Sequence, residues 1–321
     1  MIANDYPVKI NLGLHDGVCN LRCPKCFIFG ENNQNHLETK FLKGEMSKEK
    51  ILSILDELEG KNVNVQPAHW AEPLIAKTFD FFIIEAKKRN IQITINTNGL
   101  LIDEEKAQFL VDMEVDSIFI SIDAFKEETF VKTRSTDELG KVKKAVFSLL
   151  EKRASKNLPR IGVSYTEDEI NEAETEDFLN YWIEHVDAVR INATYTDDRH
   201  VVKDDISSSD RKPCKFLFDS MVINYNGDVP VCCLDTFNQT NMGNVFDNNV
   251  KEVWQGSDFE FVRKAQIDGD YDKIPFCKNC DIWASDHYNE TTEGNLFIRR
   301  SAYMTYYNRI DRLDSWKNVK R

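Results

Sequence analysis

The sequence predicts an α/β fold, an incomplete (β/α)6 TIM-like barrel followed by a small α+β module. Short β-rich runs alternate with helical patterns from Tyr6 to Ala193, as is typical of parallel strands joined by right-handed crossovers. After Ala193 the chain turns polar and aperiodic, and then supplies short strands together with a second group of cysteines. Six β/α units, rather than eight, favour an incomplete barrel.

The elements of the barrel follow from β-branched residues in short runs and from apolar residues at helical spacing. The expected strands are Val8–Leu12, Val63–Ala68, Ile91–Asn96, Ser117–Ile122, Arg160–Tyr165 and Ala188–Ala193. The expected helices cover about Ser47–Leu58, Leu74–Arg89, Glu104–Asp112, Lys141–Lys152 and Thr175–His185. Ser47 is placed to cap the first of these helices.

Changes of composition divide the chain into a barrel (1–195), a linker (196–212), the module (213–281) and a C-terminal helical extension (282–321). In the module, Asn226-Gly227 predicts a β-hairpin between Met221–Tyr225 and Asp228–Cys232. In the extension we expect a helix at about Ile298–Leu313. Four aromatic residues form either a packing stripe or part of a lid: Tyr303, Tyr306, Tyr307 and Trp316.

The composition excludes several classes of protein. The 321 residues include 54 acidic side chains against 41 lysines and arginines, a net charge of −13, which argues against a nucleic-acid partner. No run of 18 apolar residues is found, and the N-terminus has neither a basic start nor an apolar core. Neither a membrane span nor a signal peptide is therefore expected, and we expect a cytoplasmic protein.

Three of the eight cysteines follow the first expected strand, at spacings of four and three: Cys19, Cys23 and Cys26. A cubane of four irons offers four sites for thiolates. A loop that supplies three leaves one iron open for an exogenous ligand. The alternative is a zinc site, which needs a fourth protein ligand; His15 and His36 are the available candidates.

This CxxxCxxC segment, in the loop after the first barrel strand, resembles the signature of the radical S-adenosylmethionine (radical SAM) superfamily. The resemblance implies a 4Fe-4S cluster whose open iron chelates the amino and carboxylate groups of SAM. It further implies that one electron from the reduced cluster cleaves SAM to a 5′-deoxyadenosyl radical, which removes a hydrogen atom from the substrate. An electron donor such as flavodoxin or ferredoxin is then expected.

Polar residues at the ends of the later strands extend the resemblance. His69-Trp70-Ala71-Glu72-Pro73 is similar to the family element that meets the SAM ammonium, which implies this role for Glu72. Ser121 and Arg134 match positions that contact the carboxylate and ribose region of SAM. The remaining predicted SAM contacts are Phe27, Asn98 and Asp123. Without the resemblance, these residues also fit helix entry, turn chemistry and surface charge.

The second cysteine group offers four ligands and one additional thiol. Cys214, Cys232, Cys277 and Cys280 make a closed set, and Cys233 is left over. Their context resembles the abbreviated auxiliary-cluster module (twitch) of SPASM-type radical SAM enzymes, which implies a second 4Fe-4S cluster. A four-cysteine zinc site is the alternative. Cys233 fits either a small buried residue or a hydrogen-atom donor.

A fully ligated second cluster favours electron transfer, and hence substrate oxidation. The resemblance extends to the aminocyclitol (2-deoxy-scyllo-inosamine) dehydrogenase type, which implies oxidation of a secondary alcohol of a sugar or cyclitol. A small-molecule substrate is favoured over a peptide because the chain starts almost directly with its first strand. Candidate bases for the hydroxyl proton are Tyr165, Arg190, Arg199 and His200. Radical epimerisation with Cys233 as donor, maturation of a ribosomal peptide, and a non-catalytic iron-sulfur or zinc-binding protein remain alternatives.

Overall fold

The computed structural model describes residues 1–30, 43–194, 211–235 and 237–317. It divides into two compact units, each assembled from distant stretches of the chain. Unit 1 comprises 1–18, 38–93 and 195–287, and unit 2 comprises 19–37, 94–194 and 288–321. The expected linker falls almost entirely outside the described residues. The units thus cut across the linear boundaries expected from composition.

Unit 1 contains a parallel sheet in the order β9-β1-β4, extended by the first residues of β5. The strands of unit 1 are β1 (Lys9–Leu12), β2 (His15–Asp16), β3 (Gly44–Glu45), β4 (Asn64–Gln66) and β9 (Ser220–Ile223). β2 and β3 form a separate antiparallel pair. Its α-helices are α2 (Lys48–Leu58), α3 (Phe79–Lys88), α8 (Phe216–Asp219), α9 (Val250–Trp254) and α10 (Ser257–Asp268). Its 3₁₀ turns are η1 (Pro73–Ile75), η4 (Tyr271–Lys273) and η5 (Ile282–Asp286).

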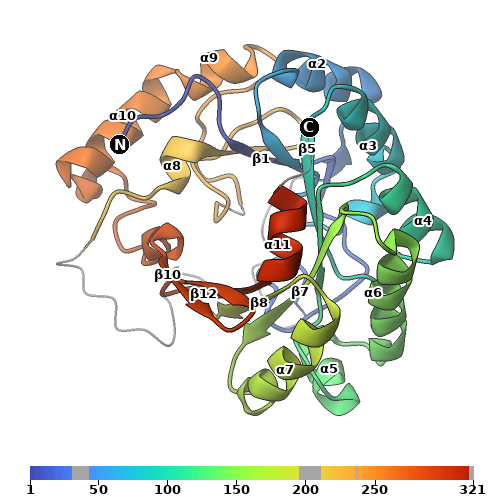
Figure 1. The fold of residues 1–321 in the computed structure, drawn as a ribbon. Coiled ribbons are helices and arrows are strands. Elements are labelled where there is room, and N and C mark those ends of the chain that lie inside the picture. The colour runs from blue at the N-terminus through green and yellow to red at the C-terminus, as the bar shows by residue number, and fades with distance from the viewer. Residues whose placement is uncertain (31–42, 195–210, 236, 318–321) are drawn as a thin grey trace. The chain divides into compact units, whose positions relative to one another are not determined.

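Unit 2 continues the strand and helix alternation. β5 (Gln92–Thr97), whose last residues belong here, β6 (Ser117–Ser121), β7 (Arg160–Glu167) and β8 (Ala188–Ala193) are parallel. The three further strands β10 (Asn289–Glu293), β11 (Leu296–Arg300) and β12 (Met304–Arg309) are antiparallel, and β12 pairs with β8 (Figure 1). The helical segments are α4 (Glu104–Asp112), α5 (Glu127–Arg134), α6 (Leu139–Arg153), η2 (Glu172–Glu174), α7 (Thr175–His185) and α11 (Ile310–Lys317).

The six parallel strands expected from the sequence are all confirmed, in the expected order β1, β4, β5, β6, β7 and β8. Ser47 caps α2 as expected, because its hydroxyl accepts from the Lys50 amide at 3.4 Å. The helix expected from Leu74 to Arg89 is broken into η1 and α3. The break lies before Thr78, whose amide donates to Glu45 Oε1 at 2.9 Å rather than to a helical carbonyl.

Two expectations about the C-terminal third are wrong. Asn226-Gly227 does form a turn, in which the Gly227 amide donates to the Asn224 carbonyl at 2.9 Å, but no strand within the described residues returns along β9. β9 pairs with β1 instead. Most of the expected helix Ile298–Leu313 is occupied by β11 and β12, and only Ile310–Leu313 is helical, as the start of α11. The expected aromatic stripe is therefore divided, because Tyr306 and Tyr307 point to opposite faces of β12.

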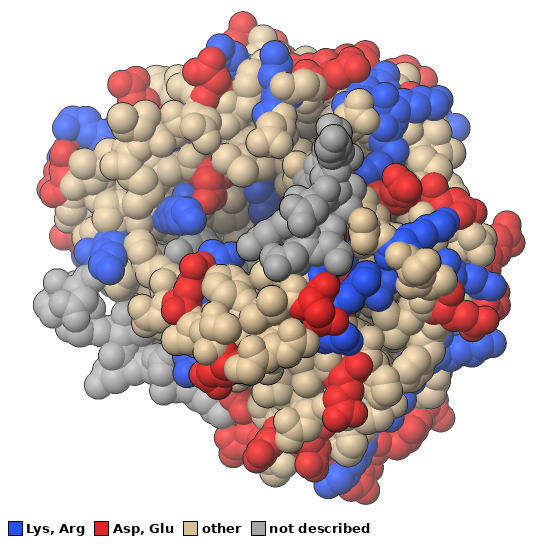
Figure 2. All heavy atoms as spheres, in the orientation of Figure 1, with Lys and Arg blue, Asp and Glu red and all other residues tan. Residues whose placement is uncertain are grey.

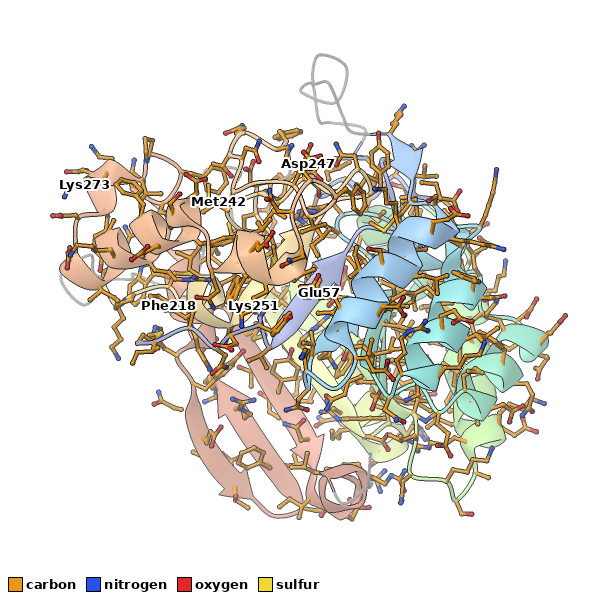
Figure 3. The ribbon with its side chains drawn as sticks, turned by 90° about the horizontal axis from the view of Figure 1, so that it is seen from above. Glu57, Phe218, Met242, Asp247, Lys251 and Lys273 are labelled. Atoms are coloured by element: carbon orange, nitrogen blue, oxygen red, sulfur yellow. The ribbon has the colours of Figure 1, made fainter. Side chains whose placement is uncertain are left out.

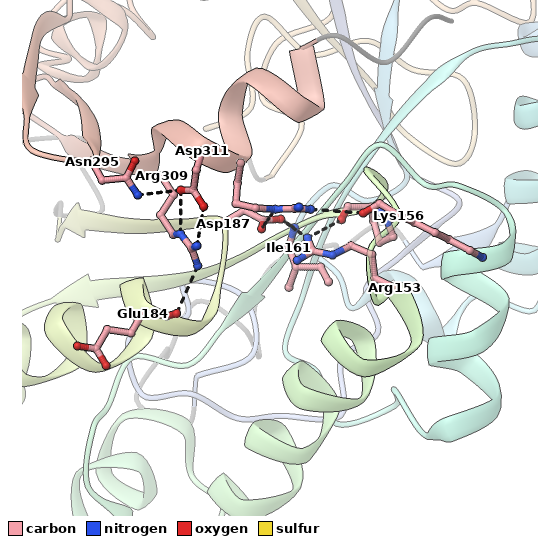
Figure 4. Close-up of polar contacts among 10 residues, drawn as sticks. Arg153, Lys156, Ile161, Glu184, Asp187, Asn295, Arg309 and Asp311 are labelled. Carbon is pink, nitrogen blue, oxygen red and sulfur yellow. Dashed lines mark hydrogen bonds and ion pairs between the residues drawn. The ribbon is translucent and has the colours of Figure 1, made fainter.

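Polar anchors fix distant segments inside each unit. In unit 1, the Glu57 carboxylate accepts from the amides of Val250 and Lys251 at 2.8 and 2.9 Å and so caps α9 (Figure 3). In unit 2, the buried carboxylate of Asp187 binds the guanidinium of Arg153 and, at 3.0 Å, Nε of Arg312 on α11 (Figure 4). These contacts attach the C-terminal strands and helix to the parallel sheet of unit 2.

On the face drawn in Figure 2, acidic and basic side chains alternate without a large region of one sign. Among the described residues, no helix combines the length and the apolar composition needed to cross a bilayer.

Candidate functional site

The N-terminal cysteines lie in a compact loop of unit 2. The amide of Cys26 donates to the Cys23 carbonyl at 2.9 Å, which closes a tight turn between these two thiols. Two further amides point at sulfur: Leu21 N lies 3.4 Å from Cys19 Sγ, and Phe29 N lies 3.3 Å from Cys26 Sγ. Hydrogen bonds of this kind stabilise thiolates and tune the potential of an iron-sulfur cluster.

Gly30 allows the loop to fold back on itself. Its amide donates to the Cys26 carbonyl at 3.0 Å. A Cβ at Gly30 would lie 2.6 Å from the Cys26 oxygen, 2.9 Å from the Pro24 oxygen and 3.0 Å from the Cys23 oxygen. Sequence reasoning missed this residue, although a glycine four positions after the last cysteine was the available signal.

Arg134 and Asp123 lie beside the same loop. The Arg134 Nη2 pairs with Asp123 Oδ2 at 2.8 Å, and its Nη1 lies 3.9 Å from Cys23 Sγ. Burial alone would lower the pKa of Arg134, but Asp123 and the nearby thiolates of Cys23 and Cys19 raise it. A permanent positive charge therefore stands next to the cysteine loop, where an anionic cluster or the SAM carboxylate would bind.

The other predicted SAM contacts in unit 2 are divided between the loop and the sheet. Asn98, directly after β5, donates to Asn20 Oδ1 at 2.8 Å and so holds the cysteine loop. Ser121, at the end of β6, shares a hydrogen bond with Ser164 of β7 at 3.1 Å. Phe27 is half-buried within the loop itself. Five of the six predicted SAM contacts thus belong to unit 2 with the three cysteines.

Glu72, the sixth, belongs to unit 1 and is only 3% exposed, so it is not the solvated acid of an ordinary helix entry. Its carboxylate caps η1 through the Leu74 amide at 3.3 Å, and its carbonyl oxygen lies 2.8 Å from His15 Nε2. Burial lowers the pKa of His15, against the raising effect of this contact and of Glu45. Sequence reasoning considered His15 only as a zinc ligand and missed this supporting role.

The second cysteine group gathers in unit 1. Its four members line one cavity of about 70 Å³: Cys214, Cys232, Cys277 and Cys280. Three of them also belong to or pack against an apolar cluster that includes Phe218, against which Met242 packs as well. Phe218 and Met242 are labelled in Figure 3. Burial raises the pKa of the Cys232 thiol well above its usual range, and the adjacent Cys233, Cys277 and Cys280 raise it further.

These two donor sets fit iron-sulfur clusters. Among the described residues, no three His, Cys, Asp or Glu side chains gather around one metal position. A cubane needs no such convergence, because each iron takes one protein ligand. Thiolates are its usual ligands, and three in the first set leave one iron without a protein ligand. In the second set, a cationic group bound in the cavity would relieve the mutual repulsion of the buried thiolates.

Cys233 lies beside the second set without belonging to it. It lines the same cavity. Its backbone oxygen lies 3.0 Å from His69 Nε2 and accepts from Trp70 Nε1 at 2.7 Å. The loop that carries Glu72 is therefore attached to the cysteine segment by two side chains, a connection that the sequence did not reveal.

The candidate bases lie in different surroundings. Tyr165 is fully buried, its hydroxyl donates to the Asn171 carbonyl at 2.6 Å, and burial raises its pKa. The catalytic role of Tyr165 stays a prediction; in the structure its hydroxyl is engaged by a backbone carbonyl, as in the alternative structural role. Arg190 is half-buried on β8, next to Asn96 and Tyr306. Arg199 and His200 lie outside the described residues.

Comparison with known proteins supports the assignment of the two cysteine sets to iron-sulfur clusters. Residues 15–181 match the model of the radical SAM superfamily, and residues 214–281 match the SPASM iron-sulfur cluster-binding domain. A cofactor-modifying protein for tungsten-containing aldehyde ferredoxin oxidoreductase from Pyrococcus furiosus is 23% identical, over 86% of this chain and 88% of that protein. An S-adenosyl-L-methionine-dependent 2-deoxy-scyllo-inosamine dehydrogenase from Niallia circulans is 22% identical, over 82% of this chain and 88% of that protein.

A solved structure of BtrN in complex with AdoMet and 2-DOIA has the same fold. Its TM-score to this chain is 0.57 at 18% identity, and the match covers 88% of this chain and 94% of that one. The family model spans more than half of the 321 residues and contains all three N-terminal cysteines. The chain therefore belongs to the radical SAM superfamily, as an enzyme that uses SAM with a 4Fe-4S cluster and carries a SPASM domain for auxiliary cluster binding.

Proposed function

We propose that this enzyme oxidises a secondary alcohol of a sugar or cyclitol to a ketone, using one auxiliary 4Fe-4S cluster as electron acceptor. The observation that carries the proposal is the closed set of four cysteines in unit 1. Four thiolates occupy every iron of a cubane, so the group fits electron transfer better than substrate binding. The likeness to a dehydrogenase that covers most of both chains supports the same reaction.

The proposed reaction removes two protons and two electrons from the carbinol, as one hydrogen atom, one proton and one electron. SAM and its cluster would supply the radical that accepts the carbon-bound hydrogen atom, and a cluster held by Cys214, Cys232, Cys277 and Cys280 would supply the acceptor for the remaining electron. The hydroxyl proton leaves to solvent or to a base. Electrons for SAM cleavage come from a donor such as flavodoxin or ferredoxin in the cytoplasm.

The residues of unit 2 support a substrate rich in hydroxyl groups. Asn96, Ser121, Ser164 and Asn192 alternate on one face of β5 to β8, as the strand register and the period of two require. Amide and hydroxyl side chains both donate and accept hydrogen bonds, and so suit alcohols. Arg190 shares this face. Its guanidinium offers only hydrogen-bond donors, so it suits a charge partner better than a base.

The test is turnover of anaerobically reconstituted enzyme, with SAM and a reductant, on a panel of sugars and cyclitols. The proposal predicts one ketone for each 5′-deoxyadenosine, and no solvent deuterium at the reacting carbon in D₂O. Incorporation of deuterium at that carbon with no ketone would instead identify an epimerase. Product formation on a precursor peptide alone would identify a maturase. Either result overturns the proposed alcohol oxidation.

Neighbouring cysteines provide a matched pair of variants. Cys232→Ala removes a proposed ligand of the auxiliary cluster and should abolish ketone formation while SAM cleavage persists. Cys233→Ala should leave both the iron content and ketone formation unchanged, because this thiol belongs to neither cluster in the proposal. Loss of product in Cys233→Ala alone, with the iron retained, would favour the hydrogen-donor role and contradict the dehydrogenase.

A further inference from the structure

The sheet of unit 2 has two chemically distinct faces. Ile118, Ile120, Ile161 and Val163 are fully buried and alternate on one face of β6 and β7. The opposite face is polar and carries the rings of Phe119 and Tyr306, which together form an aromatic platform. There the Phe119 ring lies over Gly162, where a Cβ would meet the ring at 2.5 Å, and the polar face holds the hydroxyl and amide side chains described above.

Arg190 lies on this polar face, and no carboxylate of the described residues pairs with it. Its Nη2 donates to Asn96 Oδ1 at 3.3 Å and its Nη1 reaches Tyr306 Oη at 3.5 Å, both neutral acceptors at long range. Its Nε is buried and has no hydrogen-bond partner among the described residues. The guanidinium carbon stands 5.1 Å from the centre of the Phe119 ring. A planar fork of donors is therefore held in place but incompletely satisfied.

Two more arginines strengthen the positive potential. The Arg160 guanidinium lies 5.3 Å from the centre of the Phe119 ring and donates to Asn308. Burial lowers the pKa of Arg160, the nearby Tyr306 and Asp187 oppose this shift, and the charges of Arg190 and Arg299 add to it. Cations that repel one another in this way attract an anion. This concentration of positive charge runs against the net charge of the chain, which is −13.

The acids near these arginines already have basic partners other than Arg190. Asp187 binds Arg153 and Arg312, and Glu290 pairs with Arg299 at 2.8 Å. Within the described ranges, no carboxylate forms an ion pair with Arg190. A half-buried guanidinium without a counter-ion is costly, and a bidentate oxyanion is the ligand that its fork fits.

We propose that Arg190 binds an anionic group of the substrate, a phosphate or a carboxylate, so that the substrate is an acidic or phosphorylated sugar or cyclitol. This inference rests on the proposed function, since it assigns a charge to the same substrate. The aromatic platform of Phe119 and Tyr306 fixes the guanidinium, and Asn96 holds its second nitrogen. The hydroxyl groups of the substrate then face the polar side chains of β5 to β8.

The test measures binding to the reconstituted holoenzyme with SAM, by titration calorimetry and by the ligand-dependent rise in melting temperature. Glucose 6-phosphate, glucuronate and inorganic phosphate are compared with neutral glucose and myo-inositol. We expect the anionic probes to bind at least tenfold more tightly than their neutral parents. In Arg190→Gln the affinity for the anionic probes should fall roughly 10- to 100-fold. The affinity of Arg190→Lys should lie between that of the wild type and that of Arg190→Gln.

Arg89→Gln is the matched control, because it removes one positive charge from the C-cap of α3 in unit 1, where Arg89 pairs with Glu85 and Asp56. It should leave anion affinity within twofold of the wild type. Full iron content and SAM cleavage without substrate verify that each variant is folded. Equal affinity for charged and neutral probes, or unchanged affinity in Arg190→Gln, would overturn the inference. Anion binding through Arg190 without ketone formation would instead refute the proposed oxidation alone.

Discussion

The sharpest structural prediction concerns Gly30, which follows the three N-terminal cysteines. In Gly30→Ala, the new Cβ would lie 2.6 Å from the Cys26 oxygen, so that carbonyl must move by about 0.4 Å to reach even the 3.0 Å limit of real contacts. The two other carbonyls at 2.9 and 3.0 Å block movement of the Cβ away from it. Such overpacking costs about 1–3 kcal/mol, and here the strain falls on the backbone that carries two cluster thiolates.

The assay is iron content after anaerobic reconstitution, together with SAM cleavage. The wild type should hold about eight irons in two cubanes, whereas Gly30→Ala should retain only the auxiliary cluster, about four irons, and cleave little SAM. Gly140→Ala is the control, because a Cβ at Gly140 would meet nothing within 4 Å. Normal iron content and normal SAM cleavage in Gly30→Ala would refute the assigned role of this glycine.

Three further predictions concern charges in both units. Arg134→Gln leaves Asp123 without its ion-pair partner and should cost about 3 kcal/mol of stability; Asp123→Asn in the same chain should restore part of the melting temperature, and additive losses would contradict the pairing. Asp187→Asn weakens the buried contact with Arg153 and should cost about 3–5 kcal/mol, seen as a large fall in melting temperature; a change of a degree or less would contradict the anchoring of the C-terminal strands. Burial raises the pKa of Asp16 from 3.8 to about 7, against the lowering effect of a backbone hydrogen bond. The unfolded chain releases this proton near pH 4 while the folded chain keeps it to about pH 7, so this group should reduce the free energy of unfolding by up to about 4 kcal/mol as the pH rises through that window. Asp16→Asn should therefore melt progressively higher than the wild type as pH rises from 5 to 8, and a constant difference would contradict the shift.

The parallel strands could be predicted from the sequence because their local pattern and their burial agree. Ile93 and Ile95 of β5, for example, are fully buried at alternate positions, as the β-branched run indicates. The cysteine sets could also be predicted, since their spacing reflects a ligand geometry and not a tertiary contact. Their assembly inside separate compact units could not, because each unit combines segments more than a hundred residues apart.

The C-terminal errors have a common physical cause. Tyr303, Tyr306 and Tyr307 have helical spacing, yet Tyr306 pairs with Arg190 and Tyr307 with Val189 on the edge of a sheet formed much earlier in the chain. β9 likewise pairs with β1, about 210 residues away. Non-local pairing overrode the local pattern in both cases. The contacts of Gly30, His69 and Arg190 were hidden for the same reason, because their partners are distant in sequence or are backbone atoms.

The central claim is that Cys19, Cys23 and Cys26 hold a cubane with one iron open to SAM. Electron paramagnetic resonance of the reduced Cys232→Ala variant, which should contain only this cluster, tests the claim directly. The account predicts a 4Fe-4S signal whose g-values shift when SAM is added. Substitution of any of the three cysteines should remove this signal. A signal that is absent, or that is the same with and without SAM, would contradict the account.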